Sequence, residues 1–180
     1  MSESSAQIEV LGTPPHDADL ERLIDLLLET VQSDAAIGFL RSATRSDVRA
    51  YWLGVFAGAH PRTLLFVARR GDSFVGTVQV QPARAHNQPH RAEIAKLMVH
   101  PTARRTGLGR ALMEAAEEGA RRAGLTLLTL DTRAGDTAEN LYQSLGWTRL
   151  GAIPDYALDP DGCTLHGTAV YYKLLERDVG

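Results

Sequence analysis

Residues 93–110 read EIAKLMVHPTARRTGLGR, and this stretch decides the fold. Its first part predicts a strand, Glu93–Val99, followed by a basic run with glycines that leads into a helix ending at Ala123. Strict alternation along the strand puts residues 93, 95, 97 and 99 on one face and residues 94, 96 and 98 on the other. Gly107 and Gly109 allow the backbone to approach a ligand closely. Free N–H groups of the first helical turn and the helix dipole then offer a seat for a pyrophosphate.

Known phosphate-binding motifs do not match this loop. The dinucleotide-binding fingerprint needs a third glycine where Leu112 stands, and the Walker loop needs a Gly-Lys-Ser/Thr sequence that is absent. A pair of glycines before a helix is also typical of an ordinary tight connection. The arginines at 104, 105 and 110 add the positive charge that favours the phosphate interpretation.

The flanking segments predict one domain of mixed helices and strands. Upstream, we expect a strand at Gln7–Leu11, a helix from Asp17 or Asp19 through Val31, a helix opening at Ser46-Asp47, and strands at Thr63–Ala68 and Phe74–Gln81. Downstream, we expect a strand at Leu125–Leu130, a short helix from Asp136 or Thr137 through Leu145, and strands at Trp147–Ile153 and Thr168–Leu175. This order predicts an α/β (α+β) fold, a single three-layer domain.

Composition narrows the class of protein. The chain has 180 residues, a net charge of −3 and a pI of about 6.1, which does not suggest binding to nucleic acid or to an anionic membrane. Its lone cysteine, Cys163, favours a reducing compartment, and the start of the chain lacks the basic and apolar regions of a signal peptide. We therefore expect a cytoplasmic protein. The histidines have no spacing suited to a metal, so no metal site is predicted.

The stretch Leu97–Pro101 followed by Arg104–Gly109 resembles the acetyl-CoA-binding motif of GNAT-type N-acetyltransferases. The segment AENLY at 138–142, followed by LGW at 145–147, resembles the second motif of that family. The resemblance implies a GNAT-like domain with a mixed, mostly antiparallel sheet flanked by helices. It spans 7–180, after a flexible tail at 1–6. It also implies that acetyl-CoA is the co-substrate and a small-molecule amine the acceptor, in a monomer or a homodimer.

Several shorter segments are similar to the tabtoxin-resistance acetyltransferases within that family. They are ETV at 29–31, IGF at 37–39, AExxKLMV at 92–99, LDT at 130–132, PDG at 160–162 and LHxTAxY at 165–171. This closer resemblance implies an amino acid-like acceptor, with β-lactam toxins or antibiotics among the candidates.

The resemblance assigns roles to individual residues. Tyr142 is the expected acid that protonates the leaving thiolate, since a tyrosine stays protonated at neutral pH. Glu93 and Asp131 are the expected bases for the amine, although a water chain in place of one of them stays open. The pair matches the proton acceptors of tabtoxin-resistance-like enzymes, and partial desolvation beside apolar runs is expected to make them better bases. The expected contacts of acetyl-CoA are Leu97, Met98, Val99, Arg104, Arg105, Thr106, Gly107, Leu108, Gly109, Arg110, Asn140 and Tyr142.

Two other functions stay open at this point. A protein or peptide N-acetyltransferase needs an open groove, whereas the predicted polar loops at Pro82–Pro89 and Pro154–Gly167 favour a covered pocket. A non-catalytic acyl-CoA sensor needs the loop at Arg104–Gly109 but none of the three catalytic candidates. The joint presence of Glu93, Asp131 and Tyr142 favours catalysis.

Overall fold

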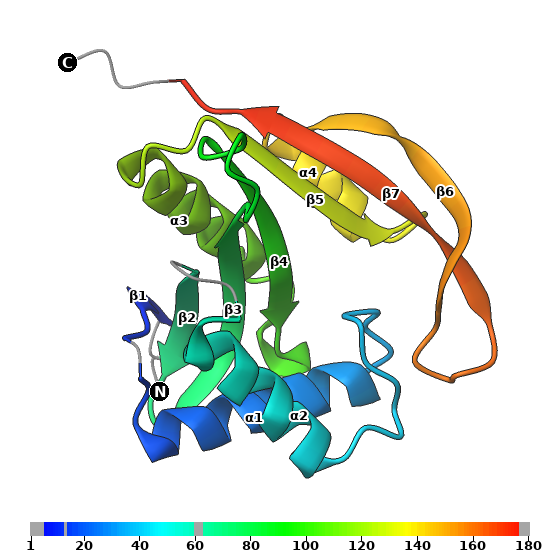
Figure 1. The fold of residues 1–180 in the computed structure, drawn as a ribbon. Helices are drawn as coiled ribbons and strands as arrows, with labels where there is room; N and C mark the ends of the chain where they lie inside the picture. The colour runs from blue at the N-terminus through cyan, green and yellow to red at the C-terminus, as the bar shows by residue number, and fades with distance from the viewer. Residues whose placement is uncertain (1–5, 13, 60–62, 177–180) are drawn as a thin grey trace.

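The computed structural model describes residues 6–12, 14–59 and 63–176, and these form three layers around one sheet (Figure 1). Within them the sheet has seven strands in the order β1-β2-β3-β4-β5-β7-β6. β4 and β5 pair in parallel, and the other neighbours pair antiparallel. The predicted mixed, mostly antiparallel sheet is therefore confirmed. Residues 1–5 of the predicted tail and the predicted domain's end at 177–180 lie outside the described residues.

Helices α1 and α2 cover one face of the first half of the sheet. The elements here are β1 (Gln7–Val10), α1 (Asp17–Gln32), α2 (Arg45–Gly54) and a π-helical turn (Val55–Ala59). Leu23, Ile24 and Leu27 of α1 pack with Trp52 of α2 in one buried cluster. Thr44 caps α2 in a reciprocal box with Asp47, so the helix begins slightly before the predicted opening at Ser46-Asp47.

The central strands form a hairpin followed by a bulged strand. β2 (Leu64–Arg70) and β3 (Ser73–Pro82) pair antiparallel, and β3 pairs with β4 (Arg91–Val99). The β3–β4 register shifts because Thr77 lies opposite Met98 while Gln79 lies opposite Ala95, which leaves an extra residue on β4. Lys96 lies in this bulge with a φ of +52°.

The bulge overturns the strict alternation predicted for β4. Ile94 packs in the core on the α3 side, whereas Met98 packs in the core with α1 and α2. These residues were predicted on the same face. Leu97 and Val99 pack against the same core as Ile94. An inserted residue reverses the faces of everything after it, because side chains alternate with a period of two.

β4 and β5 separate soon after they start. β5 (Leu127–Arg133) pairs with β4 at Arg91, Ala92 and Glu93 only, among the residues that the structure describes. Figure 1 shows the two strands diverging from this point. The separation leaves one backbone edge of β4 open beyond Glu93. β5 also continues beyond the predicted strand end at Leu130, so Asp131 lies inside the strand.

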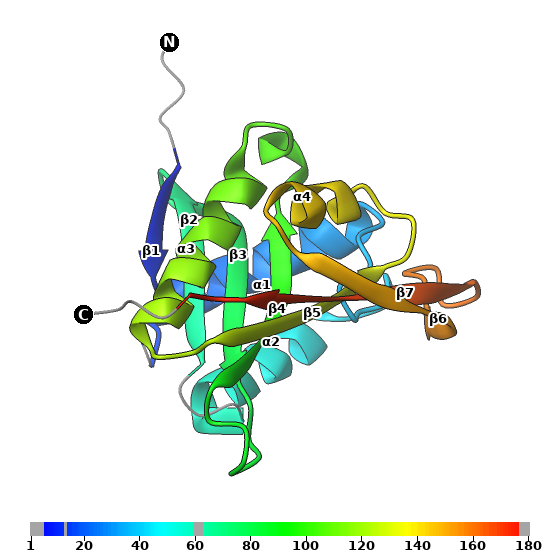
Figure 2. The same ribbon diagram turned by 90° about the horizontal axis from the view of Figure 1, so that it is seen from above.

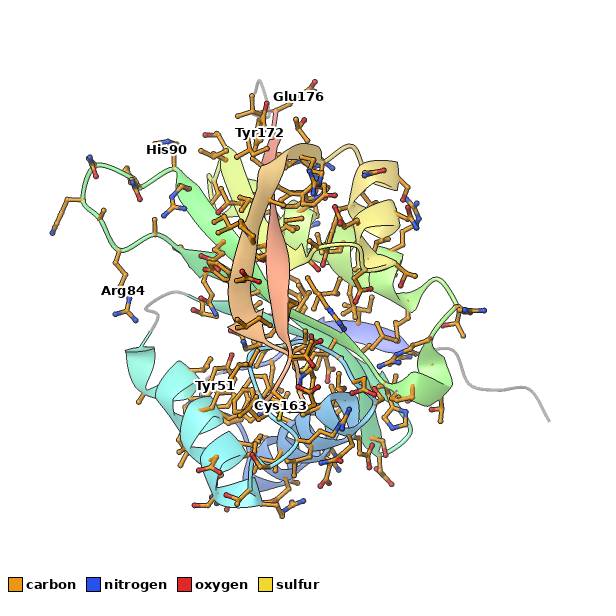
Figure 3. All side chains as sticks on the ribbon, turned by 90° about the vertical axis from the view of Figure 1, so that its right-hand side faces the viewer. Tyr51, Arg84, His90, Cys163, Tyr172 and Glu176 are labelled. Carbon is orange, nitrogen blue, oxygen red and sulfur yellow. The ribbon has the colours of Figure 1, made fainter. Side chains whose placement is uncertain are left out.

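Helices α3 and α4 lie on the other side of the sheet (Figure 2). They span Leu108–Arg122 and Ala138–Ser144. Helical spacing predicts a buried stripe on α3 at residues 108, 111, 112, 115, 116, 120 and 123. This stripe is partly wrong, since residues 111 and 115 are half-buried and residue 123 is exposed. Met113 and Glu117 are buried instead. The carboxylate of Glu117 accepts hydrogen bonds from Trp147 Nε1 at 2.9 Å and Lys173 Nζ at 2.6 Å, which is why a charged residue is tolerated there.

The last two strands are longer than predicted. β6 spans Thr148–Leu158 and β7 spans Leu165–Leu174, so most of the expected loop at Pro154–Gly167 is a two-stranded ribbon. A register shift between Ile153 and Ala157 accommodates Pro154 at the sheet edge. Within the described residues, no helix is long and apolar enough to cross a membrane.

We expect Lys173→Met to lower the free energy of unfolding by about 3 kcal/mol, because it leaves the buried carboxylate of Glu117 without its close cation. Lys173 Nζ also donates to the carbonyl oxygen of Leu145 at 2.6 Å. Urea denaturation measures the loss. Arg122→Met is the matched control, since it removes an exposed ion pair with Glu118 and should change stability by less than about 0.5 kcal/mol. Equal losses in the two variants would contradict the structural role of Lys173.

Candidate active site

A large cavity of about 700 Å³ lies between the start of α3, the end of β4 and the start of α4. Its lining includes Leu97, Met98, Val99, Arg104, Arg105, Gly107, Leu108, Gly109, Arg110 and Tyr142. These are ten of the residues predicted to contact acetyl-CoA. The bulge and the divergence of β5 open this space, and α3 points its N-terminus into it. Basic side chains and a helix N-terminus on one wall give the cavity the character of a phosphate site.

The loop before α3 is shaped by its own hydrogen bonds. Arg104 Nε donates to the carbonyl oxygen of Val99 at 3.2 Å, and its Nη2 donates to Ser33 Oγ at 2.6 Å. Gly107 has a φ of +85° and stands directly before the first helical turn. A Cβ there would meet no protein atom within 4 Å, so the backbone at Gly107 faces open space. The N–H groups of this turn are thus accessible for an anion.

Two of the predicted contacts of the cofactor, Thr106 and Asn140, do not line this cavity. Thr106 Oγ1 donates to the carbonyl oxygen of Ala103 at 2.8 Å and is not part of the cavity lining. Asn140 is exposed on α4 and is also outside that lining. Arg110 lines the cavity, and its Nη2 donates to Ser144 Oγ on α4 at 2.7 Å.

A smaller cavity of about 250 Å³ lies on the other side of the β4–β5 opening. Glu93 and Asp131 both line it, as does the segment Ala36–Phe39 between α1 and α2. Asp131 Oδ2 accepts a hydrogen bond from Thr168 Oγ1 on β7 at 3.0 Å. Both carboxylate residues are exposed overall, so the predicted desolvation is not found. The structure nevertheless brings both candidate bases to one cavity.

Tyr142 stands where the two cavities meet, since it lines both. Its residue is only 6 % exposed, and its ring packs against Trp147 and Tyr171 at centroid distances of 6.3 and 5.8 Å. Burial raises the pKa of Tyr142 well above the ordinary value, and a side-chain hydrogen bond with Thr132 opposes this shift. The phenol is therefore protonated at neutral pH and able to donate a proton.

Sequence reasoning assigned no role to three residues that line the smaller cavity, Lys96, Thr132 and Arg133. Thr132 lines both cavities and bonds to Tyr142, and Arg133 Nη2 pairs with Asp159 Oδ2 at 2.7 Å. Residues 132 and 133 follow Asp131 directly. A predicted strand extending to residue 133, as β5 does, would have placed both of them beside Asp131. Lys96 belongs to the AExxKLMV segment at 92–99, but that resemblance gave it no role, and it lies in the bulge that alternation could not predict.

Metal ligands do not gather in the described part of the chain. No group of three or more His, Cys, Asp or Glu side chains there is arranged to hold an ion. His100 instead accepts from the backbone N–H of Thr102 and pairs through Nε2 with Glu29 at 2.6 Å, which braces the turn before the phosphate loop.

Comparisons with known proteins agree with this geometry. Residues 21–147 match the acetyltransferase (GNAT) family. The chain is 37 % identical over 117 residues to an uncharacterized N-acetyltransferase in the hisH-hisA intergenic region of Azospirillum brasilense. The matched stretch covers 64 % of this chain and 68 % of that protein.

Solved structures share the fold. The yncA protein of Salmonella typhimurium, solved with its cofactor acetyl-CoA, is 19 % identical with a TM-score of 0.76, covering 98 % of each chain. A ribosomal-protein-alanine N-acetyltransferase from Brucella melitensis is 22 % identical with a TM-score of 0.76, covering 94 % of this chain and 99 % of that one. With the family match over most of its length and a cavity that suits a nucleotide thioester, the chain belongs to the GNAT acetyltransferase family and is an acyltransferase that uses acetyl-CoA as its co-substrate.

Proposed function

We propose that this enzyme transfers the acetyl group of acetyl-CoA to the primary amine of a small, amino acid-like molecule. The observation that carries the proposal is the position of Tyr142 between a large basic cavity and a small cavity with two carboxylates. A cofactor thioester reaching this junction from the basic side would meet an amine held on the carboxylate side. Holding both reactants in one orientation removes much of the entropy cost of their encounter.

The chain's residues would divide the proton transfers between them. Glu93 and Asp131 accept the proton that the amine loses as its nitrogen bonds to the acetyl carbon. Tyr142 gives a proton to the sulfur as the carbon–sulfur bond breaks. The cofactor supplies the activated acetyl group, and the backbone of β4 around Val99, beside the opening between β4 and β5, would orient it.

A protein or peptide acceptor fits this site less well. The small cavity is bordered by residues 36–39 on one side and by Tyr156–Leu158 of β6 on the other. The two borders are linked because the backbone N–H of Arg41 donates to the carbonyl oxygen of Pro160 at 2.8 Å. A chain of residues needs an open groove, whereas this arrangement favours a compact acceptor. A sensor that only binds acyl-CoA would leave Tyr142 and the two carboxylates without a role.

Detoxification of a β-lactam toxin or antibiotic is the finer proposal, and it rests on the sequence segments at 29–31, 92–99 and 160–171. A cytoplasmic location is proposed from the lone exposed cysteine, Cys163, which needs no oxidising compartment. Thiol release from acetyl-CoA tests the function, with amino acids, β-lactam amino acids, aminoglycosides and polyamines as acceptors. A rate at the level of the buffer blank with all of these amines would contradict it.

Substituting either carboxylate should slow transfer. We expect Asp131→Asn and Glu93→Gln each to lower kcat/KM by about tenfold, because the remaining carboxylate still accepts the proton. Initial rates of thiol release measure the change. Asp155→Asn is the control, since it removes an exposed carboxylate of β6 that lines neither cavity, and its rate should equal that of the unmodified protein. Full activity in both site variants would assign the base to another group.

A further inference from the structure

Lys96 is a lysine in an unusual place. The chain's only lysines are Lys96 and Lys173, and every other strongly basic side chain is an arginine. Lys173 donates hydrogen bonds to the carboxylate of Glu117 and to the carbonyl oxygen of Leu145. Lys96 lies in the β4 bulge with a positive φ, a conformation that costs free energy in a residue other than glycine. Strain of this kind is typical of functional positions.

The Lys96 side chain reaches under the segment that borders the small cavity. Nζ lies 5.9 Å from the centroid of the Phe39 ring and 5.5 Å from that of Tyr51, which is within the range of cation–π attraction. A Cβ at Gly38 would lie 3.1 Å from Nζ, so the backbone passes close to the ammonium. Burial raises the pKa of Tyr51 to about 12, which keeps its ring a neutral phenol above the cation.

The charges around Lys96 are balanced in a particular way. Burial lowers the pKa of Lys96, and the negative charges of Asp131 and Glu93 across the cavity oppose this shift. Arg133 in the same cavity is paired directly with Asp159 at 2.7 Å. The small cavity therefore combines the ammonium of Lys96 with two carboxylates that suit an amine.

We infer that Lys96 is the residue that selects the acceptor by binding its carboxylate, so that the acceptor is a small α-amino acid or a close analogue. The inference rests on the proposed function and names the substrate class of the same site. A cation beside the amine-binding carboxylates repels a simple amine or polyamine. An α-amino acid carries its amine and carboxylate on one carbon, so its opposite charges match the opposite charges of one small cavity.

The test compares each proteinogenic amino acid with its carboxamide as acceptors. The carboxamide has a less basic amine, so chemistry alone favours it near neutral pH. We expect the unmodified enzyme to prefer the acid by at least about tenfold in kcat/KM. Lys96→Met, which keeps the length of the side chain, should abolish the preference through a higher KM for the acid. Arg133→Met is the matched control, and it should retain the preference because Asp159 already neutralises Arg133.

A second measurement does not depend on the variant folding or on turnover. In protein labelled at the lysine ε-carbon, Lys96 and Lys173 give separate NMR signals. N-acetyl amino acids carry the carboxylate of the product without its amine, and they should shift the Lys96 signal and leave the Lys173 signal in place. Mass spectrometry after incubation with acetyl-CoA should find Lys96 unmodified.

The outcomes separate the inference from the proposed function. Transfer to amines with no preference for the acid, an unchanged preference in Lys96→Met, a Lys96 signal that does not move, or acetylation of Lys96 itself would each overturn the carboxylate site. The absence of thiol release with every acceptor would overturn the proposed function. A shifted Lys96 signal in such a protein would still support the carboxylate site.

Discussion

Replacing Tyr142 with phenylalanine should lower kcat by about 10²- to 10⁴-fold while acetyl-CoA binds as before, because general acid catalysis is worth that much and the ring still fills its place. The hydroxyl is the only group removed. The aromatic packing against Trp147 and Tyr171 remains. Initial rates of thiol release at saturating concentrations of both substrates give kcat, and calorimetry gives the affinity for acetyl-CoA.

Tyr171→Phe is the matched control for this experiment. Tyr171 is a buried neighbour whose hydroxyl donates to Glu139, away from both cavities. Its loss should leave kcat within about twofold while removing one hydrogen bond of about 1 kcal/mol from stability. If the two variants lose activity equally, or if Tyr142→Phe keeps full kcat, the acid is another group.

The pH dependence follows from the direction of the Tyr142 shift. Burial raises its pKa, so the acid stays protonated throughout the range in which an ordinary tyrosine begins to ionise. The loss of kcat through deprotonation of this group should therefore begin only above about pH 10. A profile of kcat against pH for the unmodified enzyme checks this, and an alkaline fall with a midpoint near 8 would assign the limb to a different residue.

Much of the fold could be predicted because its signals are local. The glycines and arginines of 104–109 and the apolar period of α1 each depend on neighbours in the sequence. The predicted caps of α1 and α2 are wrong, because α1 begins after His16 with Asp17 already inside the helix, and α2 is capped by Thr44. Four residues, Arg69-Arg70-Gly71-Asp72, predict a turn between apolar runs and hence the hairpin of β2 and β3. The turn itself is shorter, because both arginines pair within β2. These elements lie within a few residues of their predicted positions.

The errors arise where pairing between strands decides the structure. Alternation in 93–99 cannot reveal a bulge, because the extra residue exists only relative to β3. For this reason Met98 lies on the face opposite to Ile94, and Lys96 faces the rings of Phe39 and Tyr51. Proline and glycine at 154 and 167 suggested a loop, yet the edge position of β6 and a register shift accommodate the proline within the ribbon.

The candidate site shows the same division. The proposed phosphate end comes from one continuous segment, so a local sequence pattern is enough to predict it. The small cavity gathers residues from the α1–α2 connection, β4, β5, β6 and β7, which only the folded chain brings together. The family resemblance, rather than any periodicity, identified the three catalytic candidates Tyr142, Glu93 and Asp131. The cavity lining supports their grouping but was not derivable from their spacing.

Gly107→Val should weaken acetyl-CoA binding by about 100-fold, or about 2.7 kcal/mol, because the phosphate seat depends on bare backbone in a left-handed conformation. The new side chain would enter open space beside the first N–H groups of α3, and its β-branch is strained at a φ of +85°. Gly109→Val should act similarly, since a Cβ there already lies 3.4 Å from Leu141 and 3.7 Å from Val99. Calorimetry with acetyl-CoA measures both affinities.

Gly124→Val separates the effect of the site from that of backbone strain. Gly124 follows the other end of α3, has a φ of +76° and equally open surroundings, and lines neither cavity. That variant should unfold at a lower temperature yet bind acetyl-CoA with unchanged affinity. Binding that survives in Gly107→Val and Gly109→Val to within about threefold would place the pyrophosphate elsewhere. A loss of binding in Gly124→Val equal to theirs would attribute the effect to general strain, because helix N-terminal binding is confined to the first turn.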